Sequence, residues 1–122
     1  MKTVIEQHAK LVSDLAKPGC DIKNEMTSDM AHELHMAVGV SGEAGELLDA
    51  IKKHVIYGKD LDVNNVVEEL GDIEFYLEGL RKSIGITRNE TLNANISKLR
   101  KRYESGSFSN DQAVERKDKQ DG

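Results

Sequence analysis

The chain is poor in the residues that define several protein classes. Its 122 residues include one cysteine, one proline, two phenylalanines and no tryptophan. A lone cysteine, Cys20, excludes an internal disulfide and a zinc ribbon, and it favours a reduced, cytoplasmic setting. The scarcity of aromatic residues and turn signals disfavours a β-sandwich. The sequence is instead rich in charge, with 32% charged against 38% hydrophobic residues, which is typical of amphipathic helices.

Long apolar runs are absent as well. No stretch approaches the roughly 20 apolar residues that a membrane-spanning helix needs, so no membrane partner is expected. The N-terminal sequence MKTVIEQHAKLVSDLAK lacks the apolar core of a signal peptide. The formal net charge is −5, and an acidic chain lacks the basic footprint that phosphate backbones require. We therefore expect a cytoplasmic protein with no nucleic acid partner.

Apolar residues recur at helical spacing in four segments. Pro18-Gly19 ends the first segment, Gly58 ends the second, and Asp62 and Thr87 are good caps for the third and fourth. The predicted helices cover residues 3–17, 28–57, 62–84 and 87–103. We predict an all-α protein, with a four-helix domain over residues 1–104 and a polar C-terminal tail, partly docked, over residues 105–122.

Two predicted helices each carry a pair of acidic residues beside the apolar face. The pairs have the spacing ExxE and ExxD, so each pair lies on one strip of its helix. The four residues are Glu43, Glu46, Glu69 and Asp72. If the two helices pack together, the four carboxylates share one space, where they repel unless a cation binds them. Oxygen ligands of this kind suit Mg²⁺.

A glycine precedes each member of the first acidic pair. Gly42 and Gly45 each cost a helix roughly 0.8–1 kcal/mol relative to alanine. We interpret them, together with Gly39 and Ala50, as small residues that leave room for a ligand or a neighbouring backbone. The competing interpretation is that the acidic residues form ordinary solvated helix faces. Spacing alone leaves both interpretations open.

A family resemblance favours the first interpretation. The stretches GEAGELLDAIKKH and EELGDIEFYL, followed by NISKLRKRY and FSNDQAVER, resemble the MazG-like nucleotide pyrophosphohydrolases of the all-α NTP pyrophosphatase superfamily. The resemblance covers the chain from about His35 to Arg116. The family pattern is EExxE, a spacer and ExxD. Gly42 stands in place of the first glutamate of that pattern, which leaves the number of metal ions and the identity of the base open.

The resemblance implies an enzyme that hydrolyses a nucleoside triphosphate to the monophosphate and pyrophosphate. It implies Mg²⁺ as cofactor, with Mn²⁺ as a substitute, and a metal site made by Glu43, Glu46, Glu69 and Asp72. Glu43 is assigned as the catalytic residue that orients or deprotonates the attacking water. Substrate choice stays open between a broad nucleoside triphosphate specificity and one restricted to a deoxynucleotide such as dUTP or dCTP. A different class also stays open, namely a non-catalytic helical interaction module.

Four further residues are candidate substrate contacts. Asn95, Lys98 and Arg102 fall on one strip of the last predicted helix and match the family segment N-x-x-K-L-x-x-R-Y. The alternative is an ordinary basic helix end. Tyr76, one turn after Asp72, could stack on the nucleotide or belong to the core.

The breadth of the apolar stripes predicts a homo-oligomer. A chain of 122 residues buries only a modest core by itself, so wide stripes favour assembly. We favour a tetramer over a dimer. The resemblance adds that the substrate pocket is shared between subunits. The alternative is a monomer in which the N-terminal helix covers the remaining stripe.

Overall fold

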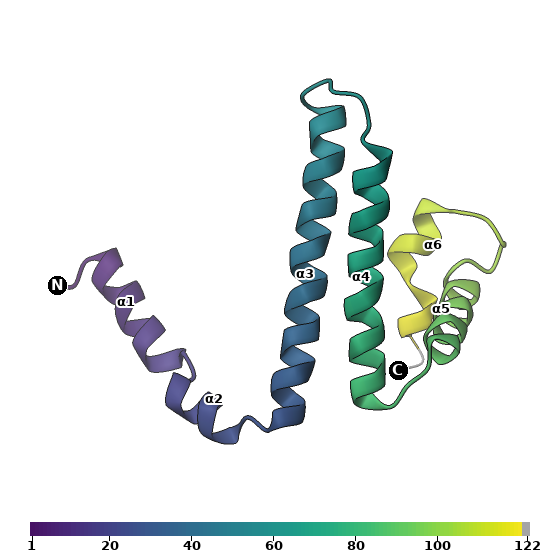
Figure 1. Ribbon diagram of the computed structural model, residues 1–122. Helices are drawn as coiled ribbons and strands as arrows, with labels where there is room; N and C mark the ends of the chain where they lie inside the picture. Colours follow the sequence, from purple (N-terminus) through teal and green to yellow (C-terminus); the bar gives the residue numbers. More distant parts are fainter. Residues whose placement is uncertain (121–122) are drawn as a thin grey trace. The chain divides into compact units, whose positions relative to one another are not determined.

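The computed structural model describes residues 1–120, and their regular structure is helical throughout (Figure 1). The elements are α1 (Val4–Leu15), α2 (Gly19–Glu25), α3 (Ser28–Val55), α4 (Val63–Ile84), α5 (Arg88–Arg102), α6 (Asn110–Glu115) and the 3-10 helix η1 (Lys117–Lys119). The predicted all-α class is confirmed. The expected number of four helices is too low for the described residues, because α2 and α6 are too short to produce a periodic apolar pattern.

The two unexpected helices begin at recognisable start signals. Pro18, with φ −61°, is the N-cap of α2, and Asp21 provides negative charge in its first turn. Ser109 caps α6 by accepting a hydrogen bond from the Gln112 backbone N–H. Each helix therefore starts where local chemistry favours it, although neither has an apolar stripe long enough to be noticed in the sequence.

The chain divides into two compact units, Met1–Ala31 and the part from His32 onward. The first unit contains α1 and α2, and none of the residues in these two helices is buried. Thr3 and Glu6 form a capping box at the start of α1. Among residues 1–120, no helix combines the length and the apolar character that crossing a membrane would need.

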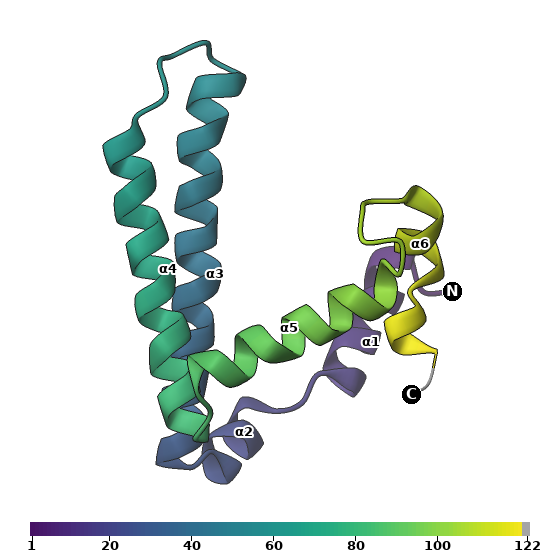
Figure 2. The same ribbon diagram turned by 90° about the vertical axis from the view of Figure 1, so that its right-hand side faces the viewer.

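In the second unit α3 and α4 form an antiparallel hairpin and lie side by side (Figures 1 and 2). Gly58, with φ 68°, makes the turn after α3, and His54 Nδ1 donates a hydrogen bond to the Lys59 carbonyl at 2.7 Å. The Asp62 carboxylate then caps α4 by accepting from the Asn65 backbone N–H at 3.0 Å. Side chains at the end of α3 and before the start of α4 thus fix the loop at both ends.

Close contact between the two helices depends on glycine. A Cβ atom at Gly39 of α3 would overlap the Tyr76 ring of α4, and a Cβ atom at Gly79 of α4 would overlap the sulfur of Met36. Met36 is also one of two buried hydrophobic residues among those described, with Ala50. The hairpin therefore packs large side chains of one helix directly on glycines of the other.

This packing predicts opposite effects of alanine at two glycines of α3. Gly39→Ala should lower the free energy of unfolding by about 1–3 kcal/mol, because the new methyl group displaces the Tyr76 ring. Gly42→Ala is the matched control, since nothing lies within 4 Å of a Cβ atom there. It should raise stability by about 0.5–1 kcal/mol through helix propensity. Urea unfolding followed by circular dichroism measures both, and an unchanged Gly39→Ala variant would contradict the close approach.

One charged residue is buried near the end of the hairpin. Arg81 is 8% exposed, and its Nη2 lies 3.7 Å from a carboxylate oxygen of Glu74 and 3.7 Å from one of Glu78. Two acidic partners compensate for the desolvation of the guanidinium. Gly85, with φ 76°, then ends α4, and a Thr87–Glu90 capping box starts α5.

The C-terminal residues fold against α5 (Figure 2). Arg102 of α5 pairs with Asp118 of η1, and Lys117 pairs with Glu104 at 3.0 Å. Much of the predicted tail is thus helical and docked in the structure, and residues 121–122 of that tail lie outside the described residues.

Candidate functional site

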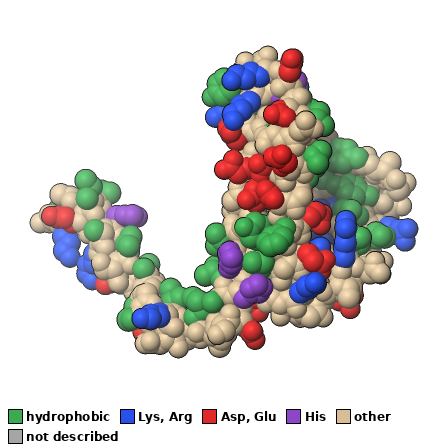
Figure 3. All heavy atoms as spheres, in the orientation of Figure 1, with side chains coloured by type: hydrophobic (Ala, Val, Ile, Leu, Met, Phe, Trp, Pro, Cys, Tyr) green, Lys and Arg blue, Asp and Glu red, His purple; other side chains and the backbone are tan. Residues whose placement is uncertain are grey.

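Three of the four predicted acidic ligands meet between α3 and α4. Glu43, Glu69 and Asp72 each place one carboxylate oxygen so that the three oxygens lie within 4.8 Å of one another. Acidic side chains gather on the face of the hairpin shown in Figure 3. The close packing of the helices through Gly39 and Gly79 holds the two backbones near enough for this cluster to form. We call these three residues the acidic group.

Glu69 is the electrostatic centre of the acidic group. A side-chain hydrogen bond with Glu43 and burial raise the pKa of Glu69 to about 7, and repulsion by Glu43, Asp72 and Glu46 adds to the shift. The proton on Glu69 lets two carboxyl groups lie close together without both being charged. Without a cation, the acidic group therefore holds a proton at a pH where an isolated glutamate would have lost it.

The acidic group fits a divalent cation. Glu69 Oε2 is enclosed and has no hydrogen-bond partner among the described residues. An enclosed carboxylate oxygen without a partner is costly, and a bound cation would satisfy it. The donor set consists of oxygens alone, which Mg²⁺ and Mn²⁺ prefer.

The fourth predicted ligand, Glu46, has a different place. It is exposed on α3 and lies outside the acidic group, although its charge contributes to raising the pKa of Glu69. Gly42 and Gly45 have open space where a Cβ atom would be, whereas Gly39 is occupied by Tyr76. Within one chain, Gly39 thus allows the close approach of a neighbouring helix, and room for a ligand beside Gly42 and Gly45 stays a prediction.

The raised pKa of Glu69 predicts how stability depends on pH without metal. Between the usual pKa of 4.5 and about 7, folded Glu69 keeps a proton that the unfolded chain releases. Raising the pH through this window therefore lowers the free energy of unfolding. Arg102 lowers the pKa of Asp118 from 3.8, so the contribution of Asp118 to stability changes only at lower pH. It therefore does not mask the effect of Glu69.

Thermal melts in EDTA at about pH 5 and about pH 8 measure this dependence. The melting temperature should be lower at the higher pH. Glu69→Gln, which stays neutral, should reduce the difference, and Mg²⁺ should compensate for it at the higher pH. An equal pH dependence in wild type and Glu69→Gln would contradict the assignment to Glu69.

Tyr76 is part of the packing between the two hairpin helices. Its ring lies against Gly39 and forms edge contacts with His35, at 6.1 Å between centroids, and Phe75, at 5.1 Å. The residue is half-buried, one turn after Asp72. Of the two roles that the sequence left open for Tyr76, this position agrees with packing. A contact with substrate stays a prediction.

The candidate substrate residues of α5 are not brought to the acidic group of the same chain. Asn95 and Lys98 are exposed on α5, while Arg102 is paired with Asp118. Figure 2 shows α5 leaving the end of α4 and running away from the hairpin. If these residues bind substrate at the acidic group, a second copy of the chain has to supply them.

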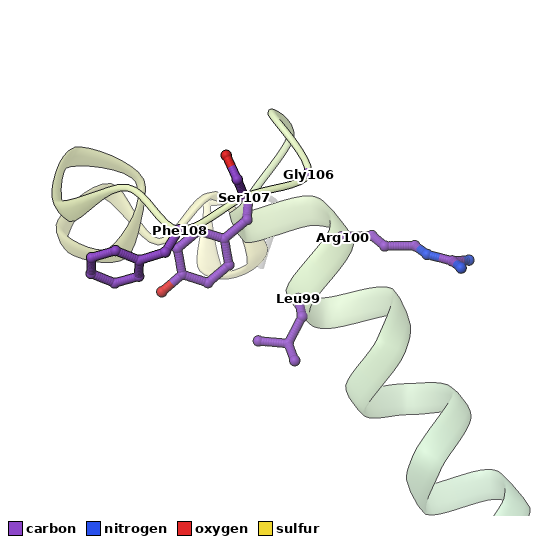
Figure 4. A pocket seen from close by; sticks show the side chains of 6 residues that line it. Leu99, Arg100, Gly106, Ser107 and Phe108 are labelled. Atoms are coloured by element: carbon purple, nitrogen blue, oxygen red, sulfur yellow. The ribbon is translucent and has the colours of Figure 1, made fainter.

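The C-terminal end of α5 borders a pocket of about 350 Å³, which Figure 4 shows. Leu99, Tyr103 and Phe108 make its wall apolar, and the rings of Tyr103 and Phe108 lie 6.0 Å apart. Arg100 also lines it, but its guanidinium points away from Phe108 in the view of Figure 4. The pocket belongs to the junction of α5 with the C-terminal segment rather than to the acidic group.

Sequence reasoning missed Asp118, the partner of Arg102. The two residues are 16 positions apart, and their contact depends on a turn between α6 and η1. No periodic signal in the sequence connects them. A charged segment after a helix with a basic end was the only hint.

Comparison with protein families assigns the chain to a family. Residues 30–107 match the model of the MazG nucleotide pyrophosphohydrolase domain, and this range includes the whole acidic group. The chain therefore belongs to the MazG nucleotide pyrophosphohydrolase family. No curated protein and no solved structure matches it significantly. The family match leaves α1 and α2 outside, so the predicted domain extent of residues 1–104 stays a prediction.

Proposed function

We propose that the protein is a Mg²⁺-dependent nucleoside triphosphate pyrophosphohydrolase that releases a nucleoside monophosphate and pyrophosphate. The acidic group carries this proposal, because three carboxylates meet there and one enclosed oxygen of Glu69 lacks a partner. Membership of the MazG family supports it independently. The metal ligands are Glu43, Glu69 and Asp72, and we add Glu46, whose charge already acts on Glu69.

The reaction breaks the bond between the α-phosphorus and the oxygen that bridges to the β-phosphorus. A water molecule attacks the α-phosphorus, its proton passes to a base, and pyrophosphate leaves with the bridging oxygen. Glu43 is the proposed base, since it is half-buried and lies beside Glu69. Mg²⁺ held by these carboxylates would neutralise phosphate charge and lower the pKa of the attacking water.

We propose that the active form is a homo-oligomer, preferably a tetramer. Leu34, Val38, Leu48 and Val55 lie on one face of α3, and all are exposed in the single chain. An exposed apolar stripe of this kind indicates an interface. A second copy would also bring Asn95, Lys98 and Arg102 of its α5 to the acidic group, with Tyr76 at the edge of the shared pocket.

Product analysis tests the reaction. The protein is incubated with Mg²⁺ and a panel of ribo- and deoxynucleoside triphosphates, including dUTP and dCTP, and the products are separated by chromatography. We expect monophosphate and pyrophosphate in equal amounts. Diphosphate with free phosphate would contradict attack at the α-phosphorus. Hydrolysis of only dUTP or dCTP would establish the narrower specificity.

Mg²⁺ binding distinguishes the proposed enzyme from a non-catalytic helical module. Mg²⁺ should raise the melting temperature of the wild-type chain, since binding to the folded state alone stabilises it by mass action. A module whose acidic residues serve only solubility would show no such shift.

A further inference from the structure

The C-terminal segment places a buried carboxylate against α5. The Asp118 side chain is 2% exposed, and its two oxygens accept hydrogen bonds from Arg102 Nε at 2.9 Å and Arg102 Nη2 at 3.2 Å. The hydrogen bonds from Arg102 lower the pKa of Asp118, so the pair is ionic at neutral pH. Asp118 lies beyond the part of the chain that matches the family model.

A strained backbone turn delivers Asp118 to this position. Arg116, between α6 and η1, has φ 51° and ψ 58° and is the one non-glycine residue with positive φ among those described. This conformation costs a non-glycine residue roughly 1–2 kcal/mol and persists only where the surrounding structure enforces it. The turn reverses the chain so that η1, with Asp118, lies against α5.

The pairing with Asp118 occupies one edge of the Arg102 guanidinium, and the Tyr103 side chain also hydrogen-bonds to Arg102. Asp118 uses Nε and Nη2, so the protons on Nη1 are not needed for this pair. The Arg102 side chain keeps 17% exposure against 2% for Asp118, so the guanidinium lies nearer the surface than the carboxylate that holds it. An arginine held in this way has already lost rotamer freedom before a ligand binds, and the cost of ordering it on binding is lower.

We propose that Asp118 is a positioning residue that holds the Arg102 guanidinium in place to donate to a phosphate oxygen of a nucleoside triphosphate. This inference rests on the proposed function, in which Arg102 contacts the substrate. Guanidinium groups bind carboxylate and phosphate through parallel N–H donors, so one arginine can join Asp118 on one edge and a phosphate on the other.

A neighbouring ion pair provides a control that distinguishes positioning of Arg102 from docking of the C-terminal segment. Lys117 and Glu104 also join the C-terminal segment to the end of α5, with Lys117 Nζ 3.0 Å from Glu104 Oε2. This ion pair does not include Arg102. Lys117→Ala therefore weakens docking while leaving the Arg102–Asp118 pair in place. It is the matched control for Asp118→Asn.

Steady-state kinetics on the full chain with Mg²⁺ test the proposal, using the nucleoside triphosphate that the wild type hydrolyses fastest. Asp118→Asn should raise KM by about tenfold with kcat changed less than about threefold, since a displaced binding group mainly weakens substrate binding. Lys117→Ala should leave KM unchanged. In an Arg102→Gln background, Asp118→Asn should raise KM no further, because Asp118 acts through Arg102.

The outcomes are distinguishable. An active Asp118→Asn variant with wild-type KM would overturn the inference alone and leave Asp118 as a docking residue. A wild-type chain that releases no pyrophosphate from any triphosphate would overturn the proposed function and this inference with it. If Asp118→Asn does not fold, Asp118→Glu gives the decision, with a raised KM expected and an unchanged KM overturning the inference.

Discussion

Glu69→Gln is expected to abolish the stabilisation of the protein by Mg²⁺ and to lower kcat by about a hundredfold or more, a loss typical of a group that acts in the chemical step. Glu69 is the central member of the acidic group, with a pKa of about 7 and an enclosed oxygen that lacks a partner. Gln keeps the shape of protonated Glu but cannot provide an anionic ligand. The metal-free fold should therefore survive while metal binding fails.

The matched control for this substitution is Glu68→Gln. Glu68 precedes Glu69 on α4, is exposed, and lies outside the acidic group. It should keep both the Mg²⁺-dependent rise in melting temperature and the activity. The measurements are thermal melts with and without Mg²⁺ and initial rates of pyrophosphate release. A Glu69→Gln variant that retains both properties would remove the acidic group from the proposed site.

Leu48→Asp should dissociate the oligomer and abolish activity. Leu48 is 68% exposed on the apolar face of α3, and it is not part of the acidic group. A charge buried in a subunit interface costs several kcal/mol, roughly enough to outweigh a modest interface. Activity should fall with the mass, because the α5 residues of a second copy would no longer reach the acidic group.

Val114→Asp is the control that shows whether a charge at any exposed apolar residue has the same effect as Leu48→Asp. Val114 is 83% exposed on α6, away from the α3 face, and its substitution should leave mass and activity unchanged. Light scattering at micromolar concentration measures the mass. A monomeric and fully active wild type would overturn both the oligomer and the shared pocket. In that case the N-terminal helix becomes the expected cover of the stripe, and Leu48→Asp would lower stability without changing mass.

Local sequence signals predicted most of the helices and the two acidic pairs, three of whose members form the acidic group. Asp62 and Thr87 act within a few residues, so the starts of α4 and α5 are close to the predicted positions. The spacing of ExxE and ExxD predicted that each acidic pair lies on one strip of its helix. The short helix α2 was missed because seven residues cannot show a helical apolar period.

The sequence by itself determined the helical class, the long hairpin helices and the acidic pairs, because these depend on spacing within a few turns. Only the tertiary structure decided that Glu43, Glu69 and Asp72 meet while Glu46 stays exposed. It also decided that Gly39 is filled by Tyr76 and that Arg102 pairs with Asp118. These contacts join residues distant in sequence, and their geometry depends on how helices pack and turn, which local periodicity does not encode.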